Sequence, residues 1–227
     1  LRKNFKVDVF LIGNLDMDNV ASLIKKYFKN RYIVSDNFEV MVDNKETKKV
    51  KEKAMKSDNI QTNLVMLFNL KNLSELEKNI TLNCFNYLYG SGGLTSKLYK
   101  SIREENSLCY AINSMYLKYD KLLMVQISLD NCNVKKAISL VKKELKSMQN
   151  GNFSEEEVRD AINNMVISLD MSLDNNIAIL NNYVFNIYDK LPSIEERKEY
   201  FKKLTKEDIV NVSKKVKLNT IFTLEGR

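Results

Sequence analysis

Alternating apolar and polar residues mark several short strands along this 227-residue chain. The opening alternation over 5–12 predicts a mostly buried strand, because every second side chain of a strand points to the same face. Further apolar runs predict strands at 61–70, 107–118, 122–130 and 220–224. A tight turn near Asp120 separates two of these runs, which should therefore form an antiparallel hairpin.

The polar, lysine-rich region 30–59 has weaker strand patterns, at 38–42 and 48–55. It could be a linker. The alternation around Val50 and the lysine content also suit an exposed strand at a sheet edge, where charged side chains discourage pairing with other chains. Both interpretations stay open.

Helical periodicity fills most of the remaining sequence, and capping residues mark where helices begin. Asp16 should cap a first helix, and Thr95 should cap the helix that carries Arg103. Reciprocal capping boxes predict further helix starts at Ser74 with Glu77, Ser154 with Glu157, Ser193 with Glu196 and Thr205 with Asp208. A helix with an apolar face over 134–145 should end at Gly151, and the helical region after it should break near Asp174.

This order of elements lacks the regular strand–helix alternation of a parallel sheet and favours an α+β domain. We expect a mixed or antiparallel sheet of about five or six strands, with helices packed mainly on one face. The single proline argues against a hinge, so residues 1–227 should form one domain. Because the sequence opens Leu1-Arg2-Lys3 without an initiator methionine, we expect it to be a fragment of a longer protein.

Charge and cysteine content narrow the function classes. The net charge of +7 comes mostly from lysine, and no aromatic platform or helix-turn-helix signature accompanies it, so we expect no nucleic-acid partner. No apolar run is long enough to span a bilayer, and we expect no membrane partner. Cys84, Cys109 and Cys132 are widely spaced, which fits free thiols in a reducing cytoplasm better than disulfides or a zinc knuckle.

Three glycines begin the most informative stretch of the chain. Gly90, Gly92 and Gly93 could end a helix, cradle a phosphate, or let the backbone approach an extended ligand closely. A phosphate loop should follow a strand, whereas these glycines follow a helical pattern. The other two roles remain open.

Arg103 should lie in the last turn of the next helix, and Tyr110 should open the following strand. A helix that ends directly before a strand can direct both side chains to one place, where they offer an extended peptide a planar fork of donors and one hydroxyl. A cation is also favourable by itself at a helix C-terminus, and Tyr110 could be a core residue. Arginine is scarce in this lysine-rich chain, which favours a role for Arg103 that lysine cannot fill.

The combined pattern G-G-x-x-S-x-L-Y-x-x-I-R-E-x-x-x-L-x-Y over 92–110 resembles the second domain of the pitrilysin-like (insulinase-family) zinc metallopeptidases. The resemblance covers nearly the whole chain and is strongest to the bacterial non-catalytic paralogues that accompany an active peptidase. It implies a half-barrel-like C-terminal domain of a two-domain protein, whose other domain carries the zinc motif H-x-x-E-H. It also implies that Arg103 and Tyr110 hold substrate near that metal, beside a short version of a glycine-rich substrate loop at Gly90, Gly92 and Gly93.

The chain has no histidine, so it cannot carry this zinc motif. We expect no cofactor in this chain, no catalysis by it alone, and zinc on a missing domain or partner. The resemblance implies a domain that binds peptide or unfolded protein for that zinc site. Its partners would be the N-terminal domain of the same protein and an active paralogue subunit or a second copy. The alternative is a catalytically inactive scaffold or protein-binding module without a peptidase role.

Overall fold

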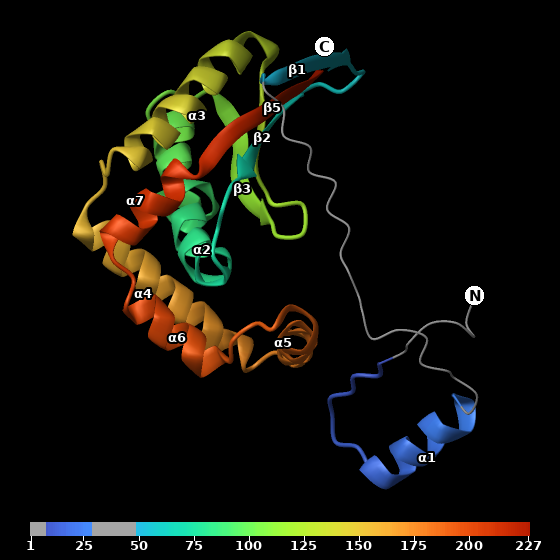
Figure 1. The fold of residues 1–227 in the computed structure, drawn as a ribbon. Coiled ribbons are helices and arrows are strands. Elements are labelled where there is room, and N and C mark those ends of the chain that lie inside the picture. The colour runs from blue at the N-terminus through green and yellow to red at the C-terminus, as the bar shows by residue number, and fades with distance from the viewer. Residues whose placement is uncertain (1–7, 29–48) are drawn as a thin grey trace. The chain divides into compact units, whose positions relative to one another are not determined.

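A computed structural model describes residues 8–28 and 49–227 of the chain (Figure 1). The chain divides into two compact units, one of Leu1–Met41 and Ser168–Ile194, the other of Val42–Ile167 and Glu195–Arg227. The second unit contains the sheet and the candidate site. The weak strand pattern at 38–42 lies outside the described residues.

The described strands form a five-stranded mixed sheet in the order β1-β5-β2-β4-β3. Their bounds are β1 Lys51–Lys56, β2 Thr62–Leu70, β3 Cys109–Leu117, β4 Leu122–Leu129 and β5 Val216–Glu225. β1 runs parallel to β5, and the other neighbours are antiparallel. The α+β class and the hairpin of β3 and β4 are confirmed, and the lysine-rich region contributes an exposed edge strand, β1.

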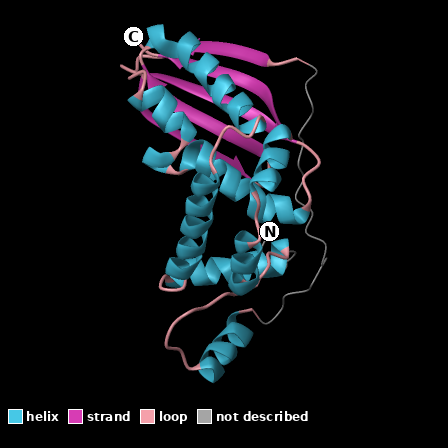
Figure 2. Ribbon diagram, turned by 90° about the vertical axis from the view of Figure 1, so that its left-hand side faces the viewer, coloured by secondary structure: helices cyan, strands magenta, loops and turns pink. Residues whose placement is uncertain are grey.

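One face of the sheet is buried against helices. Leu64, Met66 and Phe68 of β2 have no exposed surface, and Val125 and Ile127 of β4 lie beside them, equally buried. Burial of an apolar side chain of this size stabilises the fold by roughly 1.5–3 kcal/mol. In the turned view, helices lie across the strands (Figure 2). Asn63, Val65 and Leu67, which alternate with these buried residues on β2, are only half-buried and belong to the opposite face of the sheet.

The α-helices are α1 Met17–Tyr27, α2 Leu82–Asn86, α3 Val134–Gln149, α4 Glu155–Ser172, α5 Asn176–Asp189, α6 Ile194–Lys202 and α7 Lys206–Lys214. Short 3-10 helices are η3 Gly93–Thr95 and η5 Asn131–Asn133, and π-helical segments are η1 Glu77–Thr81, η2 Tyr87–Ser91 and η4 Tyr99–Glu104. No helix within the described ranges is both long and apolar enough to cross a membrane.

Side-chain caps begin the helices largely where the sequence predicts. Reciprocal boxes form at Ser74 with Glu77, Ser154 with Glu157 and Thr205 with Asp208. Asp16 caps α1 by accepting from two backbone N–H groups. The predicted break near Asp174 is confirmed, because α4 ends at Ser172 and the side chain of Asn175 caps α5. At Gly151 the chain leaves α3 with a φ of +74°, a conformation that glycine adopts easily.

The first unit corrects one strand prediction. Asp8–Ile12, the described part of the run 5–12, forms no strand, and Leu11 is 51% exposed. The apolar side chains of this segment instead line a groove of about 400 Å³. The other residues that line the groove come from α1 and α5, among them Ile24 and Leu180. Alternation alone could not distinguish the two outcomes, because apolar side chains that do not pair in a sheet still pack against nearby helices.

Candidate functional site

A glycine turn ends η2 and opens the candidate site. The Gly92 N–H donates to the Tyr87 carbonyl at 2.9 Å, and a Cβ on Gly92 would lie only 2.6 Å from that oxygen. Gly93 has a φ of +60°, and the space where its Cβ would project is open. Gly92 and Gly93 therefore end the helical segment η2. Gly92 is favoured by the close approach to the Tyr87 carbonyl, and Gly93 by its left-handed backbone.

Gly90 allows close packing between a helix and the sheet. A Cβ at this position would lie 2.6 Å from Ser114 Oγ and 2.9 Å from Leu98 Cδ1. The same Ser114 hydroxyl donates a buried hydrogen bond of 2.5 Å to Asn86 Oδ1. Gly90 therefore lets η2 approach β3. Contact of Gly90 with a substrate, like that of the other two glycines, stays a prediction.

Ser96, rather than Thr95, caps the next helical segment. Thr95 Oγ1 donates back to the Gly92 carbonyl at 3.0 Å, whereas Ser96 Oγ accepts from the Tyr99 N–H at 3.4 Å. Ser96 also has the extended backbone of an N-cap residue, with φ −72° and ψ 150°. The predicted cap at Thr95 is wrong by one residue, because the 3-10 turn η3 includes Thr95.

η4 ends directly against the start of β3. The Leu108 N–H donates to the Ile102 carbonyl at 3.0 Å, and the Ser107 N–H donates to the Arg103 carbonyl at 3.1 Å. Ser107 adopts a φ of 51°, and Asn106 Nδ2 supports the turn by donating to the Ser101 carbonyl at 2.8 Å. The passage from helix to strand that the sequence predicts is therefore held by both backbone and side-chain bonds.

Arg103 lies on the exposed side of η4. Its guanidinium carbon is 5.2 Å from the centre of the Tyr99 ring, one turn earlier, which is a cation–π contact. Burial raises the pKa of the Cys109 thiol, and the positive charge of Arg103 partly offsets this rise in pKa. The guanidinium therefore acts electrostatically on the first residue of β3, immediately before Tyr110.

Tyr110 lies at an irregularity in the strand, where the register of β3 against β4 shifts between Cys109 and Ala111. Its side chain is 52% exposed, and its hydroxyl donates to Asp130 Oδ1 at 3.0 Å. This hydrogen bond and the charge of Asp130 raise the pKa of Tyr110 above its ordinary value. Tyr110 is a surface residue and not a core residue.

The sequence analysis missed the partners of both side chains. Tyr99 precedes Arg103 by one helical turn, and helical spacing could have identified it. Asp130 follows β4, whose antiparallel pairing brings its end beside the beginning of β3. The predicted hairpin therefore contained the signal for the contact between Tyr110 and Asp130.

An ion pair joins the site's helical segment to α4. Lys97 Nζ lies 2.7 Å from Glu157 Oε1, and both side chains are mostly shielded from water. Burial alone would raise the pKa of Glu157, but hydrogen bonds from Lys97 and from the Ser154 N–H outweigh it and lower that pKa. Glu157 thus caps α4 and fixes Lys97, the residue after Ser96.

The donors in the described part of the chain do not fit a zinc site. The sequence has no histidine, and within 8–28 and 49–227 no three Cys, Asp or Glu side chains are grouped so as to hold a metal ion. Structural and catalytic zinc sites use three or four such ligands together. Cys84, Cys109 and Cys132 are all free thiols.

The family model for the peptidase M16 inactive domain matches residues 2–165. The chain belongs to this family. A Bacillus subtilis (strain 168) protein named probable inactive metalloprotease YmfF is 26% identical to this M16 inactive domain, over 97% of the chain and 52% of its own length. The resemblance indicated by the motif is therefore confirmed at the level of the family.

Solved structures share the fold of this M16 inactive domain. A conserved protein from Enterococcus faecalis V583 superposes with a TM-score of 0.83 at 21% identity, over 94% of this chain and 50% of its own. A protease from Helicobacter pylori superposes with a TM-score of 0.77 at 14% identity, over 94% of this chain and 53% of its own. The M16 inactive domain spans about half the length of these relatives.

Proposed function

We propose that this M16 inactive domain binds extended polypeptide at the junction of η4 and β3, and holds it for a zinc site on another domain or subunit. The observation that carries the proposal is the exposure of two complementary donors at one junction, the guanidinium of Arg103 and the phenol of Tyr110. The ligand class is peptide or unfolded protein, because main-chain carbonyls recur along an extended chain and accept from both donor types.

Each donor would contribute differently. Arg103 is permanently charged and has donors to spare, since its contact in the site is with the face of the Tyr99 ring. Tyr110 has a single hydroxyl proton, which Asp130 now accepts. To donate to a substrate carbonyl, the phenol would exchange Asp130 for that carbonyl. Gly93 adds an open approach to the backbone, as the resemblance implies.

The family and the length of its relatives, about twice that of this chain, suggest the partners. We propose that the N-terminal domain of the same protein and an active paralogue subunit, or a second copy, complete the assembly. Three free thiols support a cytoplasmic location. The zinc chemistry would come from those partners, because the sequence has no histidine and the described residues offer no group of metal ligands.

A scaffold or protein-binding module without any peptidase role is the second candidate. The name of the Bacillus subtilis relative, probable inactive metalloprotease, favours it. In this case the same junction would bind polypeptide, but no hydrolysis would follow in any assembly.

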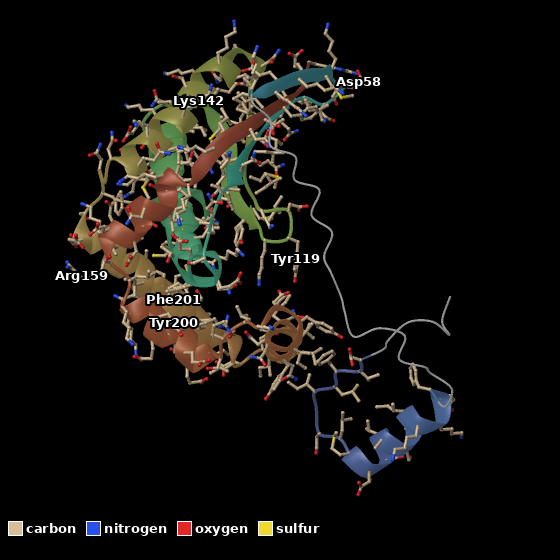
Figure 3. All side chains as sticks on the ribbon, viewed as in Figure 1. Asp58, Tyr119, Lys142, Arg159, Tyr200 and Phe201 are labelled. Carbon is tan, nitrogen blue, oxygen red and sulfur yellow. The ribbon has the colours of Figure 1, made fainter. Side chains whose placement is uncertain are left out.

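Substitution of Arg103 by lysine tests the binding role, because lysine keeps the charge and removes the planar fork. Arg159→Lys is the matched control, since Arg159 is exposed on α4, away from the junction (Figure 3). Fluorescence anisotropy with labelled, reduced and carboxymethylated lactalbumin, in about 200 mM salt to screen lysine attraction, measures affinity. We expect R103K to bind at least about fivefold more weakly, and R159K to bind like the wild type. Equal affinity of all three proteins would contradict the proposal.

Hydrolysis of the same probe separates the two candidate functions. The protein is purified from its own cells together with the subunits that accompany it, with and without R103K. Turnover that falls in R103K supports substrate positioning for a zinc site. Binding without turnover in the intact assembly supports the scaffold.

A further inference from the structure

The two edges of the sheet differ in charge. β1, at one edge, is the six-residue sequence KEKAMK, and every one of its residues is exposed. β3, at the other edge, is the nine-residue sequence CYAINSMYL, which contains no charged residue and no proline. Lysines and prolines are the usual means by which proteins prevent an edge strand from pairing with another chain. β1 has this protection and β3 does not.

β3 also has unused hydrogen-bonding capacity. Among the strands of the described chain it pairs with β4 alone, so alternate N–H and C=O groups along its outer side face away from the sheet. Ala111, Asn113 and Met115 of this strand are exposed. Backbone polar groups are strong and obligatory hydrogen-bonding groups, and a row of them at strand spacing is a template for pairing with another extended backbone.

We propose that the free edge of β3 binds an uncharged, extended segment of polypeptide as an added strand. This inference rests on the proposed function and deepens it, because it names the edge that is used and the class of segment that fits. The added strand would start beside Arg103 and Tyr110, at the beginning of β3, and continue towards the turn near Tyr119 (Figure 3). Main-chain bonds would supply affinity, and neighbouring side chains would supply selectivity.

The register of the sheet specifies these neighbours on its less buried face. Met115 lies beside Met124, which in turn lies beside Leu67, so this row of side chains is apolar. Asn113 lies beside Gln126, so the next row is polar but uncharged at the β3 edge. An incoming strand would therefore place uncharged side chains next to Met115 and Asn113. A charged side chain in either place would find no opposite charge across the strand.

Two methionines provide a matched test of the edge. Met115 on β3 is 47% exposed and Met55 on β1 is 49% exposed, and both lie on edge strands. The probe is a fluorescein-labelled, end-capped nonapeptide of alternating valine and threonine, and its anisotropy reports binding. We expect Met115→Lys to weaken binding at least tenfold, and Met55→Lys to leave it within twofold. Because both side chains are exposed, both variants should fold, which circular dichroism checks.

A second probe tests the main-chain bonds. The same peptide is N-methylated either at its valines or at its threonines, and each set points its N–H groups to a different side of the strand. We expect one methylated peptide to lose binding and the other to keep it. If both methylated peptides still bind, the proposal of an added strand is overturned.

Each remaining outcome is decisive. Equal weakening by M115K and M55K, or no weakening by either, would overturn the choice of edge. If M115K leaves peptide binding intact while R103K weakens it, the edge inference fails and the proposed function stands. If sedimentation shows a dimer that M115K dissociates while no peptide binds, a second copy occupies β3 and the proposal is overturned.

Discussion

The Tyr110 hydroxyl lies 3.0 Å from Asp130 Oδ1. This hydrogen bond joins the beginning of β3 to the residue that follows β4. It holds the exposed phenol in one place beside the η4–β3 junction. It also raises the pKa of the phenol, because a carboxylate acceptor favours the neutral form.

Asp130→Asn should therefore lower the pKa of Tyr110 towards its ordinary value of about 10. The native hydrogen bond and the charge of Asp130 both raise that pKa, and the amide removes the charge. Ultraviolet titration of tyrosinate measures the change, and Tyr110→Phe identifies which part of the signal belongs to this residue. A titration unchanged by D130N would show that the contact does not form in solution.

Thiol reactivity should report the position of Arg103. Burial raises the pKa of Cys84 to about 12, so at pH near 8 alkylation should reach exposed Cys132 first and Cys84 only on unfolding. The charge of Arg103 lowers the pKa of Cys109 against the effect of burial. In a Cys132→Ser background, Arg103→Gln should slow alkylation of Cys109, whereas Arg103→Lys should change it little. Equal rates in all three proteins would place Arg103 away from the start of β3.

Gly90→Ala should destabilise the fold by about 1–3 kcal/mol, because the new methyl would overlap the Ser114 side chain and Leu98. Gly93→Ala is the control, since its Cβ would meet open space and only the left-handed backbone would cost about 1–2 kcal/mol. Urea unfolding measures both. If G90A were neutral, η2 could not approach β3 as closely as described.

Glu157→Gln should cost roughly 1 kcal/mol at neutral pH, through loss of the ion pair with Lys97. The pKa of Glu157 is lowered in the folded state, so its contribution is present above the unfolded pKa of about 4.3 and disappears as the pH falls through the folded pKa. The difference in unfolding free energy between wild type and E157Q should therefore shrink on acidification. A difference independent of pH would assign the effect to packing alone.

Interactions between residues close in sequence made most of the fold predictable. Capping boxes such as Ser154 with Glu157 involve neighbours in sequence, so their residue types alone identify a helix start. The alternation over 5–12 failed in its described part, because it records which side chains avoid water and not what they pack against. Parallel pairing of β1 with β5 also could not be predicted, since it joins segments far apart in the chain.

The sequence predicted the position of Arg103 and Tyr110 at one junction, but not the residues that these side chains contact. The spacing of Arg103 and Tyr110 identified a helix-to-strand junction, and the structure has one there. The sequence did not show that Gly92 and Gly93 end a helix while Gly90 allows close packing. The role of Gly90 depends on Ser114, which belongs to a strand that follows later in the sequence. Asp130 was missed for the same reason, as it meets Tyr110 only through the pairing of β3 with β4.

Hydrogen exchange of the protein with and without the valine–threonine nonapeptide tests the central claim most directly. Unpaired amides on the outer side of β3 should exchange fast in the free protein and slowly once a strand pairs with them. The account predicts new protection within Cys109–Leu117 and no change in Lys51–Lys56, the strand at the lysine-rich edge. Protection confined to Lys51–Lys56, or bound peptide without any protection in β3, would contradict it.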